Sequence, residues 1–139
     1  MISFNYEVEV ELSSEDRISK WLSEVIQLEK FKEGDINYVF CDDDYLHKLN
    51  VEFLNHDTLT DIISFDYSVG KELHGDVFIS IERVHENAEN FKVDFDIELN
   101  RVMVHGILHY CGYKDKSEEE ANVMREKENH YLILFAGIE

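Results

Sequence analysis

Two histidines and one aspartate in the second half of the chain have the types and the spacing that suit metal chemistry. His105 and His109 are four residues apart, so on a helix they project from one face, one turn apart. Two imidazoles at this spacing can bind a single ion, as in the helix-borne histidine pair of zinc hydrolases. Gly112 can reverse the chain, and Asp115, six residues after His109, can then supply a third ligand. Three protein ligands leave a fourth position on zinc for water, so the pattern predicts an open metal site.

The alternative for this motif is that both histidines are ordinary core or surface side chains and that Asp115 is a solvated loop acid. The coincidence of Gly112 and Asp115 with the histidine pair favours the metal site. Of the remaining histidines, we expect His47, His85 and His130 on helix surfaces. We expect His56 and His74 in loops that could approach a site.

A helix expected over residues 94–111 must position the two histidines. Apolar side chains cover most of its sides, which predicts a central and largely buried helix. We expect it to pack against a sheet on one side and the C-terminal helix on the other, with Val102, Met103 and Leu108 buried. Gly112 stands where a left-handed C-cap would end this helix.

The other elements follow from hydrophobic periodicity and from Gly, Asn, Asp and Ser, because the chain has no proline. Period-two alternation and apolar runs predict strands at residues 2–11, 36–41, 61–67 and 76–80, the last two antiparallel, with turns at 33–35 and 70–75. Helical spacing and capping residues predict four further helices. One runs from Ser14 to about Glu29, and a second follows Asp42–Asp44 and buries Leu46, Leu49 and Phe53. A short helix contains Val84, Ala88 and Phe91, and the last one begins with a capping box at Ser117–Glu120. This order predicts an α+β domain with a small mixed β-sheet, packed with helices around the central metal-binding helix.

Composition limits the partners. The 139 residues suit one domain, and 13 Lys plus Arg against 31 Asp plus Glu give a formal net charge of −18. Binding to a phosphate backbone normally relies on a basic face, so RNA binding would require a local basic patch. No apolar run reaches the roughly 18 residues of a membrane span, and no signal peptide pattern opens the chain. We therefore expect a cytoplasmic protein without a membrane partner, with Cys41 and Cys111 as buried thiols.

Four segments resemble a known family. "HGILHYCGYKD" (105–115) resembles the HGxLHLxGYDH signature of the YbeY family, whose members are bacterial metal-dependent endoribonucleases implicated in ribosomal RNA maturation. "LNVEFLNHDTLTDIISFDY" (49–67), "GDVFIS" (75–80) and "EEANVMREKE" (119–128) resemble further stretches of the family, in the same order. The resemblance covers roughly residues 35 to 135. It implies one hydrolase domain over residues 1–139 that binds one Zn²⁺, or another divalent metal, per chain.

The sequence departs from the family pattern at three positions. Asp115 stands where the family usually has a histidine, and Lys114 where it usually has an aspartate. Leu54 stands where the family usually has an arginine that is thought important for its activity on RNA. An aspartate remains a plausible zinc ligand but makes the site more anionic and more hospitable to harder metals. The positive charge could instead come from Lys114, Lys116, Arg125 or Lys127.

Three functions remain open from the sequence. The favoured one is a zinc-dependent endoribonuclease that processes single-stranded ribosomal RNA, at the 3′ end of 16S rRNA, with the small ribosomal subunit and its assembly proteins as partners. A non-catalytic ribosome-assembly factor with a structural metal and a metal-dependent hydrolase of another substrate are the alternatives. Gly106 stands where zinc proteases carry their general base, which disfavours a peptidase. Asp61 and Asp76, each at an expected strand end, are the candidate catalytic acids, and the nucleophile could be a metal-bound water or the 2′-hydroxyl.

Overall fold

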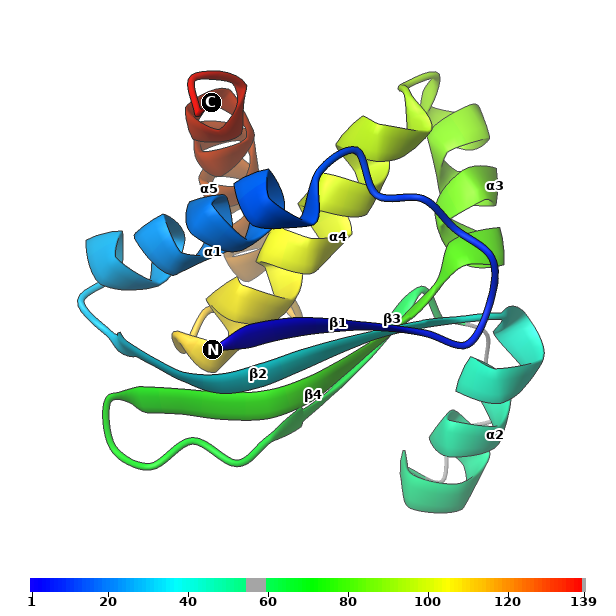
Figure 1. Ribbon diagram of the computed structural model, residues 1–139, viewed down its shortest axis with the longest axis horizontal. Helices are drawn as coiled ribbons and strands as arrows, with labels where there is room; N and C mark the ends of the chain where they lie inside the picture. The colour runs from blue at the N-terminus through cyan, green and yellow to red at the C-terminus, as the bar shows by residue number, and fades with distance from the viewer. Residues whose placement is uncertain (55–59, 139) are drawn as a thin grey trace.

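A mixed four-stranded sheet is the base of the fold. The structure is a computed structural model that describes residues 1–54 and 60–138 (Figure 1). Across the sheet the strands run in the order β1 (Ile2–Tyr6), β2 (Lys32–Cys41), β4 (Glu72–Ser80) and β3 (Ile62–Asp66). β1, β2 and β4 are parallel, and β3 is antiparallel to β4. The helices are α1 (Glu15–Leu28), α2 (Asp43–Leu54), α3 (Ile81–Phe91), α4 (Phe95–Tyr110) and α5 (Glu118–Ala136). The predicted α+β class with a small mixed sheet is confirmed.

α4 is the central helix of the layer that covers one face of the sheet. Figure 1 shows α1, α4 and α5 together on this side and α2 on the other. Val102, Met103 and Leu108 are 4%, 0% and 0% exposed, which confirms the predicted burial of α4. Successive side chains of a strand point to opposite faces. Val77 of β4 therefore joins the main core under α4, whereas Phe78 packs on the smaller cluster that α2 covers.

The helices begin at the side chains that the sequence indicated. The Ser14 hydroxyl accepts a hydrogen bond from the Arg17 backbone N–H, and Ser117 and Glu120 form the predicted capping box. An Asp42 carboxylate oxygen accepts the Tyr45 backbone N–H at 2.8 Å, so this acidic run opens α2 as predicted. These caps satisfy backbone donors that the first turn of a helix leaves without a partner.

Strand boundaries differ from the prediction because pairing partners, and not local alternation, set them. β1 ends at Tyr6 instead of residue 11, since its partner β2 ends at Cys41; the residues after it, including Val8 and Val10, still pack against the core. The expected turns at 33–35 and 70–75 were wrong in part. Residues 32 and 33 pair with residues 72 and 73, and a register shift between Glu33 and Ile36 accommodates one extra residue of β2.

Two aromatic residues expected on buried helix faces are exposed. Phe53 near the end of α2 is 59% exposed and Phe91 at the end of α3 is 58% exposed, whereas Leu46 and Ala88 on the same faces are buried. Each aromatic side chain lies at the last turn of its helix: the Phe53 ring contacts the edge of the smaller cluster through Phe65 of β3, and Phe91 lies beyond Ala88, the last buried residue of α3. None of the described helices combines the length and the apolar character needed to cross a membrane.

Candidate metal centre and its cleft

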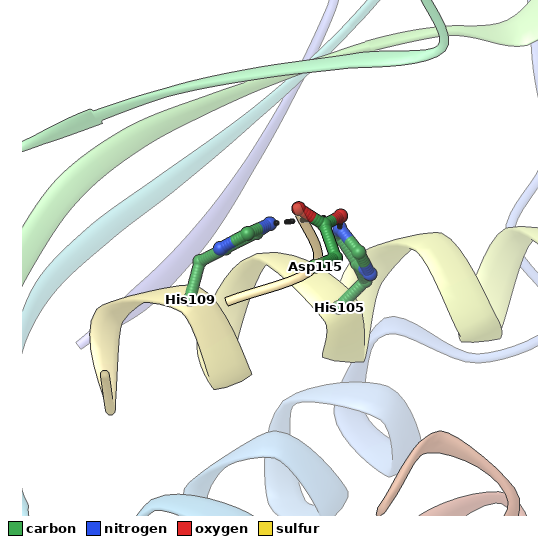
Figure 2. A group of neighbouring side chains, drawn as sticks. All are labelled: His105, His109 and Asp115. Atoms are coloured by element: carbon green, nitrogen blue, oxygen red, sulfur yellow. Dashed lines mark ion pairs between the residues drawn. The ribbon is translucent and has the colours of Figure 1, made fainter. Parts of the chain in front are cut away.

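His105, His109 and Asp115 lie together at the C-terminal end of α4. Figure 2 shows both imidazole rings directed at the Asp115 carboxylate, which comes from the loop between α4 and α5. Asp115 Oδ2 is 3.3 Å from His105 Nε2 and 3.6 Å from His109 Nε2. One ligand atom from each residue lies within 4.8 Å of the other two. Two imidazole nitrogens and one carboxylate oxygen are zinc ligands, so this donor set fits a zinc ion with an open position.

The end of α4 returns Asp115 to the two histidines. Gly112 has a φ of +99°, in the left-handed region that glycine adopts without a Cβ penalty. The Tyr113 N–H donates to the Leu108 carbonyl at 3.0 Å and the Gly112 N–H to the His109 carbonyl at 3.0 Å, the two bonds of a Schellman motif. The Tyr113 hydroxyl also donates to Glu29 Oε1 at 2.7 Å and thereby ties the loop to the end of α1.

Gly106, directly after the first histidine, faces the sheet. A Cβ at this position would lie 3.3 Å from Val77 Cγ1 and 3.4 Å from Ile62 Cδ1. A glutamate here would point into the packed interface between α4 and the sheet. The position that carries the general base in zinc proteases therefore cannot serve that role in this fold.

A buried carboxylate on α5 fixes the orientation of His105. Glu128 Oε2 lies 2.7 Å from His105 Nδ1, and Glu128 Oε1 lies 3.1 Å from Arg101 Nη1. Glu128 is 4% exposed. An ionised carboxylate only accepts hydrogen bonds, so His105 Nδ1 donates to Glu128, and Nε2 is the ring nitrogen that faces Asp115 and would bind a metal ion. Carboxylate partners of this kind orient metal-binding histidines and raise their basicity.

The surrounding charges move the pKa values of the two histidines in opposite directions. Burial alone would lower the pKa of His105, but the hydrogen bond with Glu128 and the charges of Glu128, Asp115 and Asp61 outweigh it, so the pKa of His105 is raised. Burial and the neighbouring His105 lower the pKa of His109. For Glu128, burial would raise the pKa, and the bonds with His105 and Arg101 outweigh it and lower the pKa. Glu128 is therefore ionised at neutral pH.

The three side chains line an open cleft of about 430 Å³ between α3, α4, α5 and the start of β3. The cleft contains two arginines, Arg101 and Arg125, although the chain as a whole is strongly acidic. The Arg101 side chain is 17% exposed and engaged by Glu98 and Glu128, whereas that of Arg125 is 54% exposed, with a single long contact of 3.8 Å to Glu128 Oε1. Four carboxylates, those of Asp61, Glu98, Asp115 and Glu128, line the same cleft, so the two arginines lie among acidic groups.

The sequence reasoning missed Glu98, Arg101 and Glu128. Glu98, Arg101, His105 and His109 follow one another at spacings of three, four and four along α4, and this polar stripe in an apolar helix was the available signal. Burial raises the pKa of Glu98. For Glu128 no local pattern pointed to the site.

The two aspartates expected to be catalytic lie in different places. Asp61, directly before β3, lines the cleft, and burial raises the pKa of its carboxyl. Asp76 lies inside β4 rather than at its end, because that strand begins at Glu72. Val77 faces α4, so Asp76 faces the opposite side of the sheet, where its Oδ1 accepts from Asn37 Nδ2 at 3.1 Å.

Among the cations considered as replacements for the family arginine, Arg125 lines the cleft. Lys114 lines a separate hollow with Glu119 and Glu120, and Lys127 bonds to Glu29. Leu54 ends α2 and is 42% exposed. Among the histidines expected in loops, His74 lies within β4, where its Nδ1 accepts the Asp35 N–H, and His56 lies outside the described residues.

Comparison with known proteins identifies the family. Residues 2–136 match the sequence profile of the family described as Endoribonuclease YbeY. The chain belongs to this YbeY family. It is 62% identical over 135 residues to Endoribonuclease YbeY of Flavobacterium johnsoniae, covering 97% of both chains. It is 61% identical to the protein of the same name from Flavobacterium psychrophilum, over 97% of this chain and 96% of the relative.

A solved structure supports the fold. A protein from Thermotoga maritima, determined in solution, superposes with a TM-score of 0.69 at 26% sequence identity. The match covers 99% of this chain and 90% of the other. The superposition supports the fold over nearly the whole chain, and the profile match over residues 2–136 shows the family.

Proposed function

We propose that this chain is a metal-dependent endoribonuclease that matures ribosomal RNA, acting on single-stranded RNA at the 3′ end of 16S rRNA. Its relatives are named endoribonucleases. The observation that carries the proposal is the convergence of His105, His109 and Asp115 in a cleft that also contains two arginines. The partners follow from the substrate: the small ribosomal subunit and its assembly proteins, in the cytoplasm.

We assign the metal site to zinc, held by His105, His109 and Asp115. A zinc ion at this site would supply a Lewis acid for a phosphoryl oxygen and lower the pKa of a bound water. Glu128 holds the His105 ring in the orientation and tautomer that this role needs, and Arg101 holds Glu128. The exposed guanidinium of Arg125 is placed to bind a phosphate of the substrate, since its planar donors match phosphate oxygens.

For the proton acceptor we favour Asp61. Its carboxyl lines the same cleft as the metal ligands, whereas Asp76 faces the other side of the sheet. In this role Asp61 takes a proton from the attacking hydroxyl, whether that belongs to water or to the ribose.

The test is cleavage of a single-stranded RNA with the 16S 3′-end sequence by the zinc-loaded protein, with and without chelator. His109→Ala should abolish cleavage while the protein keeps its cooperative thermal unfolding, because a ligand of an open catalytic site supports activity more than stability. His130→Ala, an exposed histidine on α5, is the matched control and should cut normally. An inactive wild type, together with a His109→Ala variant that melts far below it, would favour a structural metal in an assembly factor.

A further inference from the structure

Phe91 is an aromatic side chain left exposed at the edge of the cleft. The buried residues of α3 are Ile81, Val84 and Ala88, and Phe91 continues this stripe at the next helical position. Nevertheless it is 58% exposed and lines the cleft. The apolar face of α3 thus runs one turn beyond the core and ends in the wall of the candidate active site.

Asn87 lies beside Phe91 in the same wall. The two residues are four apart on α3, so their side chains project from one face on adjacent turns. The Asn87 Nδ2 atom is 3.5 Å from Asp61 Oδ2, at the outer limit of a hydrogen bond, which leaves most of its donor and acceptor capacity available. An aromatic face and a neighbouring amide are the groups that proteins use to stack on a base and to bond its edge.

The cleft therefore has two unlike walls. The described residues that α3 contributes, Asn87 and Phe91, are uncharged, whereas α4 and α5 contribute two arginines, two histidines and the carboxylates of Glu98 and Glu128, beside Val102. A nucleotide has the same division, with an uncharged flat base on one side and an anionic phosphate on the other. From Glu98, at one end of the cleft, to His109, α4 rises roughly 16 Å, so the cleft exceeds the metal site in length.

We propose that Phe91, with Asn87 beside it, forms a nucleobase subsite in which a base next to the scissile phosphate stacks on the Phe91 ring. This inference rests on the proposed endoribonuclease function and adds the residues that bind the base. Stacking accepts any base, because every base has a π face, so the subsite selects unpaired RNA and not a sequence. A base held in a duplex cannot reach Phe91, since its faces are already stacked.

The test is binding of a short fluorescein-labelled single-stranded RNA, followed by anisotropy with EDTA present so that no cleavage occurs. Phe91→Ala should weaken binding on the order of tenfold, the usual loss when a stacking aromatic is removed. Phe91→Trp should restore it. Tyr67→Ala is the matched control, because Tyr67 is equally exposed, at 59%, and does not line the cleft; it should bind as the wild type does.

A second probe separates base stacking from other losses. An oligonucleotide of the same length with abasic positions keeps the phosphates and lacks the bases, so Phe91→Ala and the wild type should bind it equally. Equal binding of intact RNA by both proteins, or equal losses on intact and abasic RNA, would overturn the subsite. If the zinc-loaded wild type cuts RNA while Phe91→Ala matches it in every assay, the inference fails and the function stands. If the wild type neither binds nor cuts RNA, both fail.

Discussion

Glu128 Oε2 on α5 lies 2.7 Å from His105 Nδ1 on α4, although the two residues are 23 positions apart in the chain. This contact joins the metal centre to the C-terminal helix. It also leads to the first prediction, that the metal affinity of the site depends on a residue that does not bind the metal itself.

Glu128→Gln should lower the zinc affinity by roughly 10- to 100-fold, because an amide no longer stabilises the protonated Nδ1 of His105 as a carboxylate does. The measurement is competition with a chromogenic chelator at neutral pH. Glu126→Gln, an exposed glutamate two residues earlier on α5, is the control and should bind zinc like the wild type. Unchanged affinity in Glu128→Gln would show that the contact does not tune the site.

Arg125→Gln should weaken RNA binding and make the binding constant depend less steeply on the salt concentration. A cation that contacts one phosphate contributes about one unit to the slope of log K against log salt, so that slope should fall by about one. Lys114→Gln serves as the comparison, because Lys114 lines a different hollow and should change neither quantity to the same extent. Identical slopes for the wild type and Arg125→Gln would remove Arg125 from the list of phosphate contacts.

Asp61→Asn and Asp76→Asn form a matched pair. Loss of a general base typically lowers the rate by 10²- to 10⁴-fold, so Asp61→Asn should reduce kcat for RNA cleavage by roughly that factor. Asp76→Asn should keep kcat near the wild-type value, because its side chain bonds to Asn37 on the opposite face of the sheet. Single-turnover cleavage with saturating enzyme measures both. Equal losses in the two variants would contradict the assignment of Asp61.

How far the sequence could predict this site depends on the distance along the chain between the interacting residues. The convergence of His105, His109 and Asp115 was predictable because a helical spacing and one glycine turn bring them together within 11 residues. The bond between Glu128 and His105 depends on how α5 packs on α4, which no local pattern specifies. The starts of β2 and β4 were missed for the same reason, since residues 32 and 33 form strand only by pairing with residues 72 and 73.

Phe91 shows that a local pattern can also mislead. Its place on the apolar stripe of α3 predicted a buried side chain, and the helix formed as expected. The side chain is exposed because the last turn of α3 borders the cleft and not the core. Periodicity identifies the apolar face of a helix but does not show where the core under that face ends.

The last prediction concerns a buried carboxylate that anchors the loop bearing Asp115. Glu29, at the end of α1, accepts hydrogen bonds from Tyr113, Tyr131 and Lys127, and its side chain is 9% exposed. Burial would raise the pKa of Glu29, but these three donors outweigh it and lower the pKa below its ordinary value. The unfolded chain therefore binds a proton at Glu29 at a higher pH than the folded protein does.

A lowered folded-state pKa gives stability that is fully present above the unfolded value and is lost as the pH falls through the folded one. The free energy of unfolding of the wild type should therefore decrease below about pH 4.5, the ordinary pKa of a glutamate side chain. Glu29→Gln should lower this free energy at pH 7 by roughly 1.5–3 kcal/mol, the range for hydrogen bonds to a charged group, and should make its decrease in acid shallower. Urea unfolding at a series of pH values from 7 to 3 measures both effects. Glu24→Gln on the same helix, whose carboxylate makes none of these bonds, should follow the wild-type curve. Parallel curves for Glu29→Gln and the wild type, offset by a constant amount, would mean that the ionised form of Glu29 is not what stabilises the loop.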